Sequence, residues 1–177
     1  FYYLPKIIKA AKLGDAAILK VIINILAKEK IKVISSNTYN PELTLSKGFY
    51  TKLKPSKKDH VSINNGIKLL GKINPYNHVQ GLVIKDSSII AKEKIYGTKK
   101  MLQMMSKSNK SQCILIKFPK KKQDLRLDLP TVGLDTLKDC KKHGIKGIVL
   151  KSKKNIFMNK VKSLSFANKN KIFIMVK

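Results

Sequence analysis

The chain has 177 residues, of which 43% are hydrophobic, enough for a packed core and against a disordered protein. Its 38 basic and 10 acidic residues give a net charge of +28, which draws a chain towards polyanions and anionic membranes. The longest apolar run, residues 16–27, is interrupted and too short to span a bilayer. Cys113 and Cys140 are expected to be buried free thiols, because two cysteines support neither a disulfide framework nor a zinc site.

The first half of the chain is predicted to be mainly helical. Asp15 can cap the helix that the apolar spacing after it predicts. Ser56 and Asp59 have the spacing of a capping box, which predicts a second helix that runs to about Gly71. The elements predicted here are a helix over 16–28, a short strand over 31–34, a loop over 37–55, the capped helix, and a linker over 74–77.

The second half alternates strands with helices. Gly144 stands where a helix C-cap is expected, and Thr98 can cap another helix. The predicted strands cover 79–84, 89–91, 113–118, 147–150 and 172–176, and the predicted helices cover 98–105, a segment ending near 143, and 160–168. This alternation predicts an α/β fold.

Acidic residues are scarce, and four of the seven aspartates fall close together. Asp135 and Asp139 are one helical turn apart, which is typical of a solvated helix face. Asp124 and Asp128 lie instead in the polar loop 119–133, which leaves a strongly apolar predicted strand. Sheets of α/β proteins place ligand chemistry at such loops, so these two carboxylates are candidate site residues.

The lone arginine, Arg126, lies between those two aspartates. It indicates either bidentate recognition of an anion or a structural pair with an aspartate, and the sequence leaves both readings open. Carboxylates beside cationic groups suit phosphate chemistry, because they hold a divalent cation or orient water. Gly14-Asp15 and Gly97-Thr98 each open a predicted helix, whose N-terminus can hold phosphate oxygens. The three histidines are interpreted as surface or packing residues.

Residues 117–133 resemble the UDP-2,3-diacylglucosamine pyrophosphatases of lipid A synthesis, in the two-domain type of α-proteobacteria and others, unrelated to the calcineurin-like enzyme. That family has a strand ending in Val-Lys, then Pro-Lys, then a Gln-Asp-x-Arg-x-Asp-Leu-Pro-x-x-Gly loop. The matching positions are Lys117, Pro119, Lys120, Gln123, Asp124, Arg126, Asp128, Leu129, Pro130 and Gly133. Further matches are Gly14-Asp15, Thr51-Lys52, Pro55, Gln80, Gly97-Thr98, Gly144 and Gly147.

The sequence departs from the family pattern at three positions. Ala16 replaces the second acid of a Gly-Asp-Asp motif, Asn77 replaces an acid, and Lys99 stands where an acid follows Gly-Thr. About a third of a usual family member is expected to precede Phe1, so the chain is expected to be a fragment. An inactive truncated remnant of the enzyme is therefore one alternative. A basic nucleic-acid-binding protein, favoured only by the charge, is the other.

The resemblance implies two domains and one reaction. Residues 1–75 are expected to be the end of a Rossmann-like N-terminal α/β domain, and residues 79–177 a catalytic α/β domain with a mixed sheet. The implied reaction hydrolyses the diphosphate of UDP-2,3-diacylglucosamine to UMP and 2,3-diacylglucosamine 1-phosphate. It uses Mg²⁺ or Mn²⁺, with the lipid between the domains. We expect a cytoplasmic protein of Gram-negative bacteria, peripheral at the inner membrane, a possible homodimer, and no nucleic-acid partner.

The same resemblance implies roles for individual residues. Asp128, Asp124 and Arg126 are the expected catalytic residues, and Asp128 and Asp124 the expected metal ligands. Asp128 is the position expected to be essential, either as a metal ligand or as the base that activates water. The expected substrate-binding residues are Lys117, Lys120, Gln123, Thr131, Gly133, Gln80, Gly97, Thr98, Gly14 and Asp15.

Overall fold

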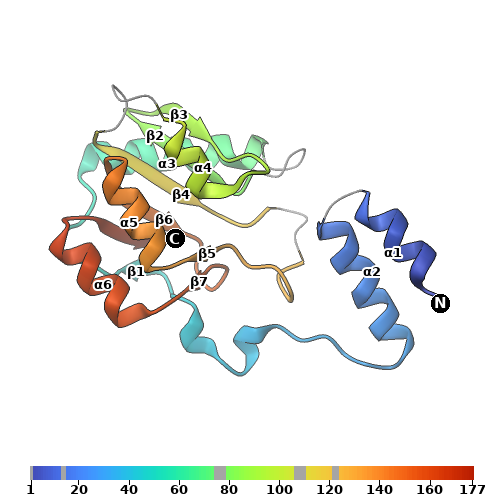
Figure 1. Cartoon of the computed structure of the whole chain (residues 1–177). Coiled ribbons are helices and arrows are strands. Elements are labelled where there is room, and N and C mark those ends of the chain that lie inside the picture. The colour runs from blue at the N-terminus through green and yellow to red at the C-terminus, as the bar shows by residue number, and fades with distance from the viewer. Residues whose placement is uncertain (1, 13–14, 74–78, 106–110, 121–123) are drawn as a thin grey trace.

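Figure 1 shows the computed structural model of the chain, which describes residues 2–12, 15–73, 79–105, 111–120 and 124–177. Its centre is a six-stranded sheet in the order β1-β8-β6-β4-β2-β3. The strands are β1 (Gly48–Phe49), β2 (Gly81–Lys85), β3 (Ser88–Lys92), β4 (Cys113–Lys117), β6 (Ile145–Leu150) and β8 (Phe173–Val176). Strands β4, β6 and β8 are parallel, whereas β1, β2 and β3 pair antiparallel with their neighbours. The predicted α/β fold with a mixed sheet is confirmed.

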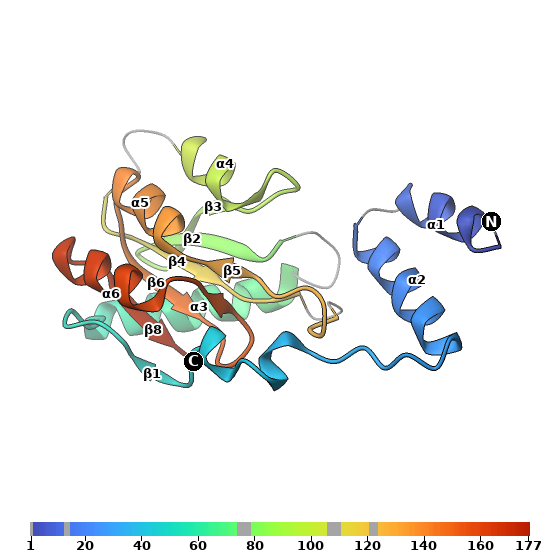
Figure 2. The same cartoon turned by 60° about the horizontal axis from the view of Figure 1, so that its bottom comes forward.

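Helices cover both faces of this sheet, as Figure 2 shows for α3 and α5. The covering helices are α3 (Lys57–Ile73), α4 (Gly97–Gln103), α5 (Leu134–Lys142) and α6 (Lys160–Lys169). Successive side chains of β4 alternate between two cores: Ile114 packs with Ile63 of α3, whereas Leu115 packs with Leu137 of α5. Because a strand buried on both faces has no polar side, β4 is apolar throughout until Lys117.

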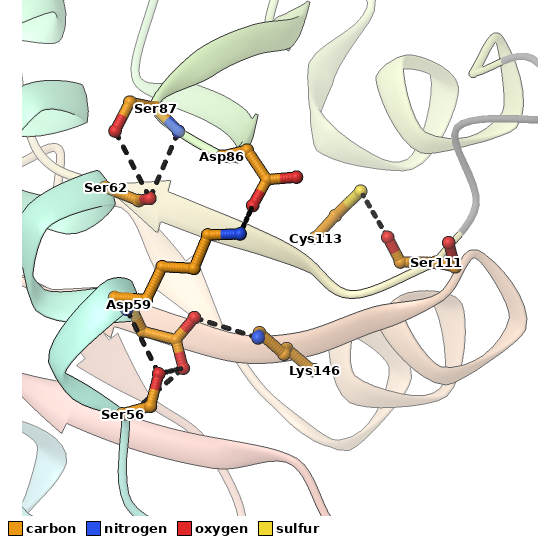
Figure 3. A network of polar contacts seen from close by, with 9 residues as sticks. Ser56, Asp59, Ser62, Asp86, Ser87, Ser111, Cys113 and Lys146 are labelled. Atoms are coloured by element: carbon orange, nitrogen blue, oxygen red, sulfur yellow. Dashed lines mark hydrogen bonds and ion pairs between the residues drawn. The ribbon is translucent and has the colours of Figure 1, made fainter.

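A polar network fixes the start of α3 to the sheet (Figure 3). The predicted capping box is confirmed: the Ser56 N–H and hydroxyl donate to the Asp59 carboxylate at 3.0 and 2.9 Å, and the Asp59 N–H donates to Ser56 Oγ at 3.2 Å. Lys146 of β6 lies 2.8 Å from the same carboxylate. Burial raises the pKa of Asp59, but hydrogen bonds from Lys146 and Ser56 outweigh it, so the pKa is lowered. Ser62 binds the N–H of Ser87 at 3.1 Å, which ties α3 to the β2–β3 turn.

The domain division predicted between residues 75 and 79 stays a prediction, but elements on its N-terminal side pack with the sheet. β1 pairs with β8 at one edge of the sheet, and α3 packs against β2 and β4. Leu70 of α3 is buried in the core between this helix and the sheet, because the apolar face of the sheet would otherwise be exposed to water. Residues 48–73 therefore belong to the same packed unit as residues 79–177. The predicted linker, 74–77, lies outside the described residues.

The N-terminal helices α1 (Leu4–Ala11) and α2 (Asp15–Lys28) pack on each other and stand apart from the sheet in both Figures 1 and 2. The helix predicted over 16–28 is confirmed, whereas α1 was missed. The strand predicted over 31–34 is wrong: the segment has no ladder partner among the described residues, and Ile31 and Ile34 are exposed. A Rossmann-like origin of this part stays a prediction. Within the described ranges, no helix combines the length and apolar character needed to cross a bilayer.

Several smaller predictions are also settled by the structure. Cys113 and Cys140 are buried free thiols, and burial raises the pKa of each. Gly144 follows α5 with φ of +70°, as a helix C-cap position requires. His143 is buried against the Asp139 carbonyl, which fits the packing interpretation of the histidines. Three short strands and two turns were missed: β1, β5 (Thr131–Val132), β7 (Ile156–Phe157), and the 3-10 turns Ser36–Thr38 and Pro41–Leu43.

Candidate functional site

A buried polar cluster stands at the end of β4, where the strand passes into the polar loop 119–133, here called the acidic loop after Asp124 and Asp128. Lys117, the last residue of β4, has its ammonium 3.3 Å from Glu93 Oε1, and both side chains are less than a tenth exposed. The Thr98 hydroxyl, from the start of α4, donates to the same oxygen at 2.8 Å and accepts from Lys117. Three side chains from β4, α4 and the segment after β3 thus form one ion-paired cluster.

The backbone of β2 is shaped to hold Glu93. The Glu93 N–H donates to the carbonyl of Gly81 at 2.9 Å, and a Cβ at Gly81 would lie 2.6 Å from Glu93 Oε2. Glycine at this position therefore leaves room for the carboxylate. Oε2 is buried and has no hydrogen-bond partner among the described residues. A buried carboxylate with one bare oxygen is costly, so its pairing with Lys117 is important to the fold.

Sequence reasoning missed Glu93, although it proposed several of its neighbours. Lys117, Thr98 and Gly97 meet in or beside the cluster, and the Gln80 carbonyl accepts the Phe118 N–H at 2.9 Å. The structure therefore brings together four residues expected to bind substrate. The signal for Glu93 was a scarce acid two residues after the strand predicted over 89–91.

The acidic loop contains a second, exposed pair. Arg126 donates from its backbone N–H and from Nε to Asp124 Oδ1, both at 3.0 Å, and from Nη2 to Oδ2 at 2.7 Å. The hydrogen bonds from the guanidinium have the largest effect, followed by the one from the backbone N–H, and they lower the pKa of Asp124 to about 2. The structural-pair interpretation of Arg126 thus describes the geometry. Asp124 accepts hydrogen bonds from two of the five guanidinium N–H groups, so this pairing leaves the other three for a further ligand.

Asp128 is held between two anchors of this loop. Its N–H donates to the Asp124 carbonyl at 3.0 Å, which closes the turn. On its other side Pro130 is buried, and the Pro130 carbonyl accepts the Ile156 N–H at 3.0 Å and the Asn155 amide at 3.3 Å. In the part of the chain that the structure describes, the Asp128 carboxylate has no side-chain partner. The backbone that carries this carboxylate is therefore fixed, and the carboxylate can serve a ligand or a water.

Some of the other residues expected to bind substrate lie in the described part of the chain, and some lie outside it. Thr131 lies in β5, which pairs with β7, and its hydroxyl donates to the Leu129 carbonyl at 3.2 Å. Gly133 precedes α5, and a Cβ there would lie 3.0 Å from the Met158 side chain. Lys120 is half-buried. Gly14 and Gln123 lie outside the described residues, as does the side chain of Asp15.

A divalent cation fits part of the predicted ligand set. The described residues contain no group of three or more histidine, cysteine, aspartate or glutamate side chains arranged for a metal. Mg²⁺ is nevertheless often bound by one or two carboxylates together with substrate phosphates and water. Asp128 fits that arrangement. Both oxygens of Asp124 accept hydrogen bonds from Arg126, so a cation would use their remaining lone pairs, and its role as a ligand stays a prediction.

Comparison with known families covers this whole region. The LpxI C-terminal domain family matches residues 46–175. The chain belongs to that family. The match includes α3 to α6, the Lys117 cluster and the acidic loop, and it begins near β1 rather than at residue 79. The LpxI resemblance of residues 117–133 is thereby confirmed.

A relative from Caulobacter vibrioides shows how the chain compares with a longer LpxI protein. It is the UDP-2,3-diacylglucosamine pyrophosphatase LpxI, 26% identical over 180 residues. The alignment covers 97% of this chain and 64% of the relative. The chain therefore spans less than two thirds of the length of the LpxI relative that it matches.

The pairing in the LpxI-like loop predicts a pH dependence. Because the folded pKa of Asp124 is lowered to about 2, the pair is complete above the ordinary Asp pKa and is lost as pH falls towards 2. Arg126→Ala should raise the Asp124 titration midpoint towards the ordinary aspartate value. The change in stability should be small, because both side chains are more than a third exposed and water screens the pair. Carboxyl-carbon NMR titration measures the midpoint. An unchanged midpoint in Arg126→Ala would contradict the pairing.

Proposed function

We propose that the chain carries the phosphate-handling part of a hydrolase of lipid A biosynthesis. The enzyme would cleave the diphosphate of UDP-2,3-diacylglucosamine to UMP and 2,3-diacylglucosamine 1-phosphate. The observation that supports this most is the acidic loop: in an LpxI-family domain, it holds Asp128 without a side-chain partner among the described residues and beside an oriented arginine. This combination suits a diphosphate, which needs charge neutralisation and a positioned water.

In this proposal the loop residues have separate tasks. Asp124 is a positioning residue, because its two oxygens hold the Arg126 guanidinium in one plane. Arg126 is half exposed, and its unused N–H groups bind phosphoryl oxygens. Asp128 binds the cation or takes the proton of the attacking water. A bound Mg²⁺ or Mn²⁺ would supply charge neutralisation at the diphosphate.

The Lys117 cluster has a supporting task in the same proposal. Its lysine charge is matched by Glu93, so the cluster adds little net field to the site. Its contacts instead join the end of β4 to the start of α4 and to the segment after β3. The start of the acidic loop is therefore fixed. The reaction rate depends strongly on placing catalytic groups to within a fraction of an ångström.

The reaction itself is the first expected result. The full-length protein with Mg²⁺ or Mn²⁺ should release UMP from UDP-2,3-diacylglucosamine, and a chelator should abolish the release. The measurement is chromatography of the uridine nucleotides over time, with and without chelator. Release of UDP in place of UMP, or an undiminished rate in chelator, would contradict the proposal.

We also propose peripheral contact with the inner membrane, because the proposed substrate is a lipid and the chain is strongly cationic. Each lysine near an anionic surface contributes about 1 kcal/mol, within a Debye length of about 8 Å at physiological salt. Co-sedimentation with anionic vesicles should therefore decrease as salt rises. Equal binding to neutral vesicles at high salt would show that this electrostatic account is wrong.

A further inference from the structure

Asn155 is a polar residue in the turn between β6 and β7, and it is only 2% exposed. Both ends of its side-chain amide are used: Oδ1 accepts the Lys151 N–H at 2.8 Å, and Nδ2 donates to the Pro130 carbonyl at 3.3 Å. Because an N–H faces one end of the amide and a carbonyl faces the other, the amide has a single favourable orientation. Asn155 therefore forms a buried bridge between the end of β6 and the acidic loop.

This bridge attaches the acidic loop to the same edge of the sheet from which the loop departs. The loop leaves the sheet at Lys117, the last residue of β4, which is in register with Leu150, the last residue of β6. Lys151 follows Leu150 directly, and its N–H is the one that Asn155 binds. The loop is thus anchored to neighbouring strand ends twice, at Lys117 where it begins and through Asn155 at Pro130.

The segment that carries Asn155 is itself fixed. Just before it, the Lys154 N–H donates to the Lys151 carbonyl at 3.1 Å and closes a turn. Just after it, the Ile156 N–H donates at 3.0 Å to the same Pro130 carbonyl that the Asn155 amide binds. A side chain can position another group only if its own backbone is held, and Asn155 meets that condition.

We propose that Asn155 is a positioning residue for Asp128, which lies two residues before Pro130. By holding the Pro130 carbonyl, Asn155 fixes the backbone that carries the Asp128 carboxylate relative to the ends of β4 and β6. The inference rests on the proposed function and deepens it, because it assigns the placement of the proposed base or metal ligand to a residue outside the acidic loop. A displacement of about 1 Å at a reacting group can cost about a hundredfold in rate.

Steady-state kinetics of full-length variants with UDP-2,3-diacylglucosamine test this role. Asn155→Ala removes both hydrogen bonds and should lower kcat at least about tenfold, with KM nearly unchanged, because it displaces Asp128 and not the surfaces that bind the substrate. Asn155→Asp keeps the shape and the acceptor for the Lys151 N–H, but at neutral pH it turns an oxygen towards the Pro130 carbonyl. It should therefore lower kcat as well, and it tests the role even if Asn155→Ala does not fold.

Thr51→Val is the matched control from another part of the sheet. Thr51 is buried, and its hydroxyl also joins two backbone groups: it accepts the Ile174 N–H at 2.8 Å and donates to the Leu53 carbonyl at 3.0 Å. These contacts lie near the start of β8, away from the acidic loop. Thr51→Val should therefore lower stability to urea and leave kcat near that of the wild type. Unchanged kcat in both Asn155 variants would overturn the proposal.

A double-variant cycle distinguishes an effect through Asp128 from a general effect on the fold. If Asn155 acts by placing the Asp128 carboxylate, its loss has little left to change once that carboxylate is absent. Asp128→Ala and the double variant Asp128→Ala/Asn155→Ala should then have nearly the same residual turnover. A further fall of about tenfold in the double variant, as great as in Asn155→Ala alone, would show that Asn155 does not act through Asp128.

Amide hydrogen exchange separates failure of this proposal from failure of the proposed function, because it needs no turnover. The Asp128 N–H donates to the Asp124 carbonyl at 3.0 Å. It should exchange about fivefold faster in Asn155→Ala, the equivalent of one net hydrogen bond, and not in Thr51→Val. If exchange changes in this way but the wild type releases no UMP, the hydrolase is wrong and the positioning stands. If UMP is released while Asn155→Ala alters neither exchange nor kcat, the positioning is wrong and the hydrolase stands.

Discussion

Asp128→Ala is expected to lower the turnover of UDP-2,3-diacylglucosamine by at least about 10²-fold, the low end for loss of a general acid or base. The reason is placement: Asp128 lies between a closed turn and the buried Leu129-Pro130, so the backbone that carries its carboxylate is held in position. In the described part of the chain, its oxygens are committed to no other side chain. The measurement is steady-state turnover of the full-length variant, with circular dichroism to establish that it is folded.

Asp124→Ala provides the matched comparison from the same loop. Its carboxylate orients Arg126 and is not free for the substrate, so its loss should cost less than the loss of Asp128. Neither change should unfold the domain, because partly exposed loop carboxylates contribute little to stability. If Asp128→Ala retains near-normal turnover while folded, Asp128 is structural and the assignment is wrong.

Glu93→Gln should produce the largest loss of stability. It leaves the Lys117 ammonium buried without a counter-charge, and removal of one partner of a buried pair typically costs about 3–5 kcal/mol. Urea unfolding of the variant should show that fall in the free energy of unfolding. Glu42→Gln, at an exposed glutamate, is the control and should change stability by less than about 0.5 kcal/mol.

The double variant Glu93→Gln/Lys117→Met separates the pair from the individual residues. Removing both charges eliminates the uncompensated ammonium, so the double variant should regain a large part of the stability that Glu93→Gln loses. A double variant less stable than Glu93→Gln, or a Glu93→Gln protein as stable as the wild type, would show that the ion pair is not what holds this cluster.

Local signals in the sequence were sufficient where the contact is local. The Ser56–Asp59 capping box and the C-cap at Gly144 depend on residues within one turn, and both are present. The Asp124–Arg126 pair is also local, and sequence reasoning had it as one of two readings. By contrast, the apolar run at 31–34 is not a strand, because a strand needs a partner that its own sequence does not specify.

The missed features depend on contacts between distant segments. Glu93 contacts Gly81 and pairs with Lys117 only because the register of three strands places these residues side by side. Strand β1 was likewise missed, because it pairs with β8, and that pairing joins residues more than a hundred positions apart. The motif in the acidic loop therefore located the candidate site, whereas its supporting contacts required the fold.

If water attacks the diphosphate of the lipid nucleotide, an oxygen atom from the solvent must appear in the phosphate of one product. The full-length protein is incubated with UDP-2,3-diacylglucosamine and Mg²⁺ in water enriched in oxygen-18, with Asp128→Ala as the inactive control. Mass spectrometry should find one heavy oxygen in the phosphate of either UMP or the 2,3-diacylglucosamine 1-phosphate. Release of UDP, with the heavy oxygen on the sugar, would contradict the account.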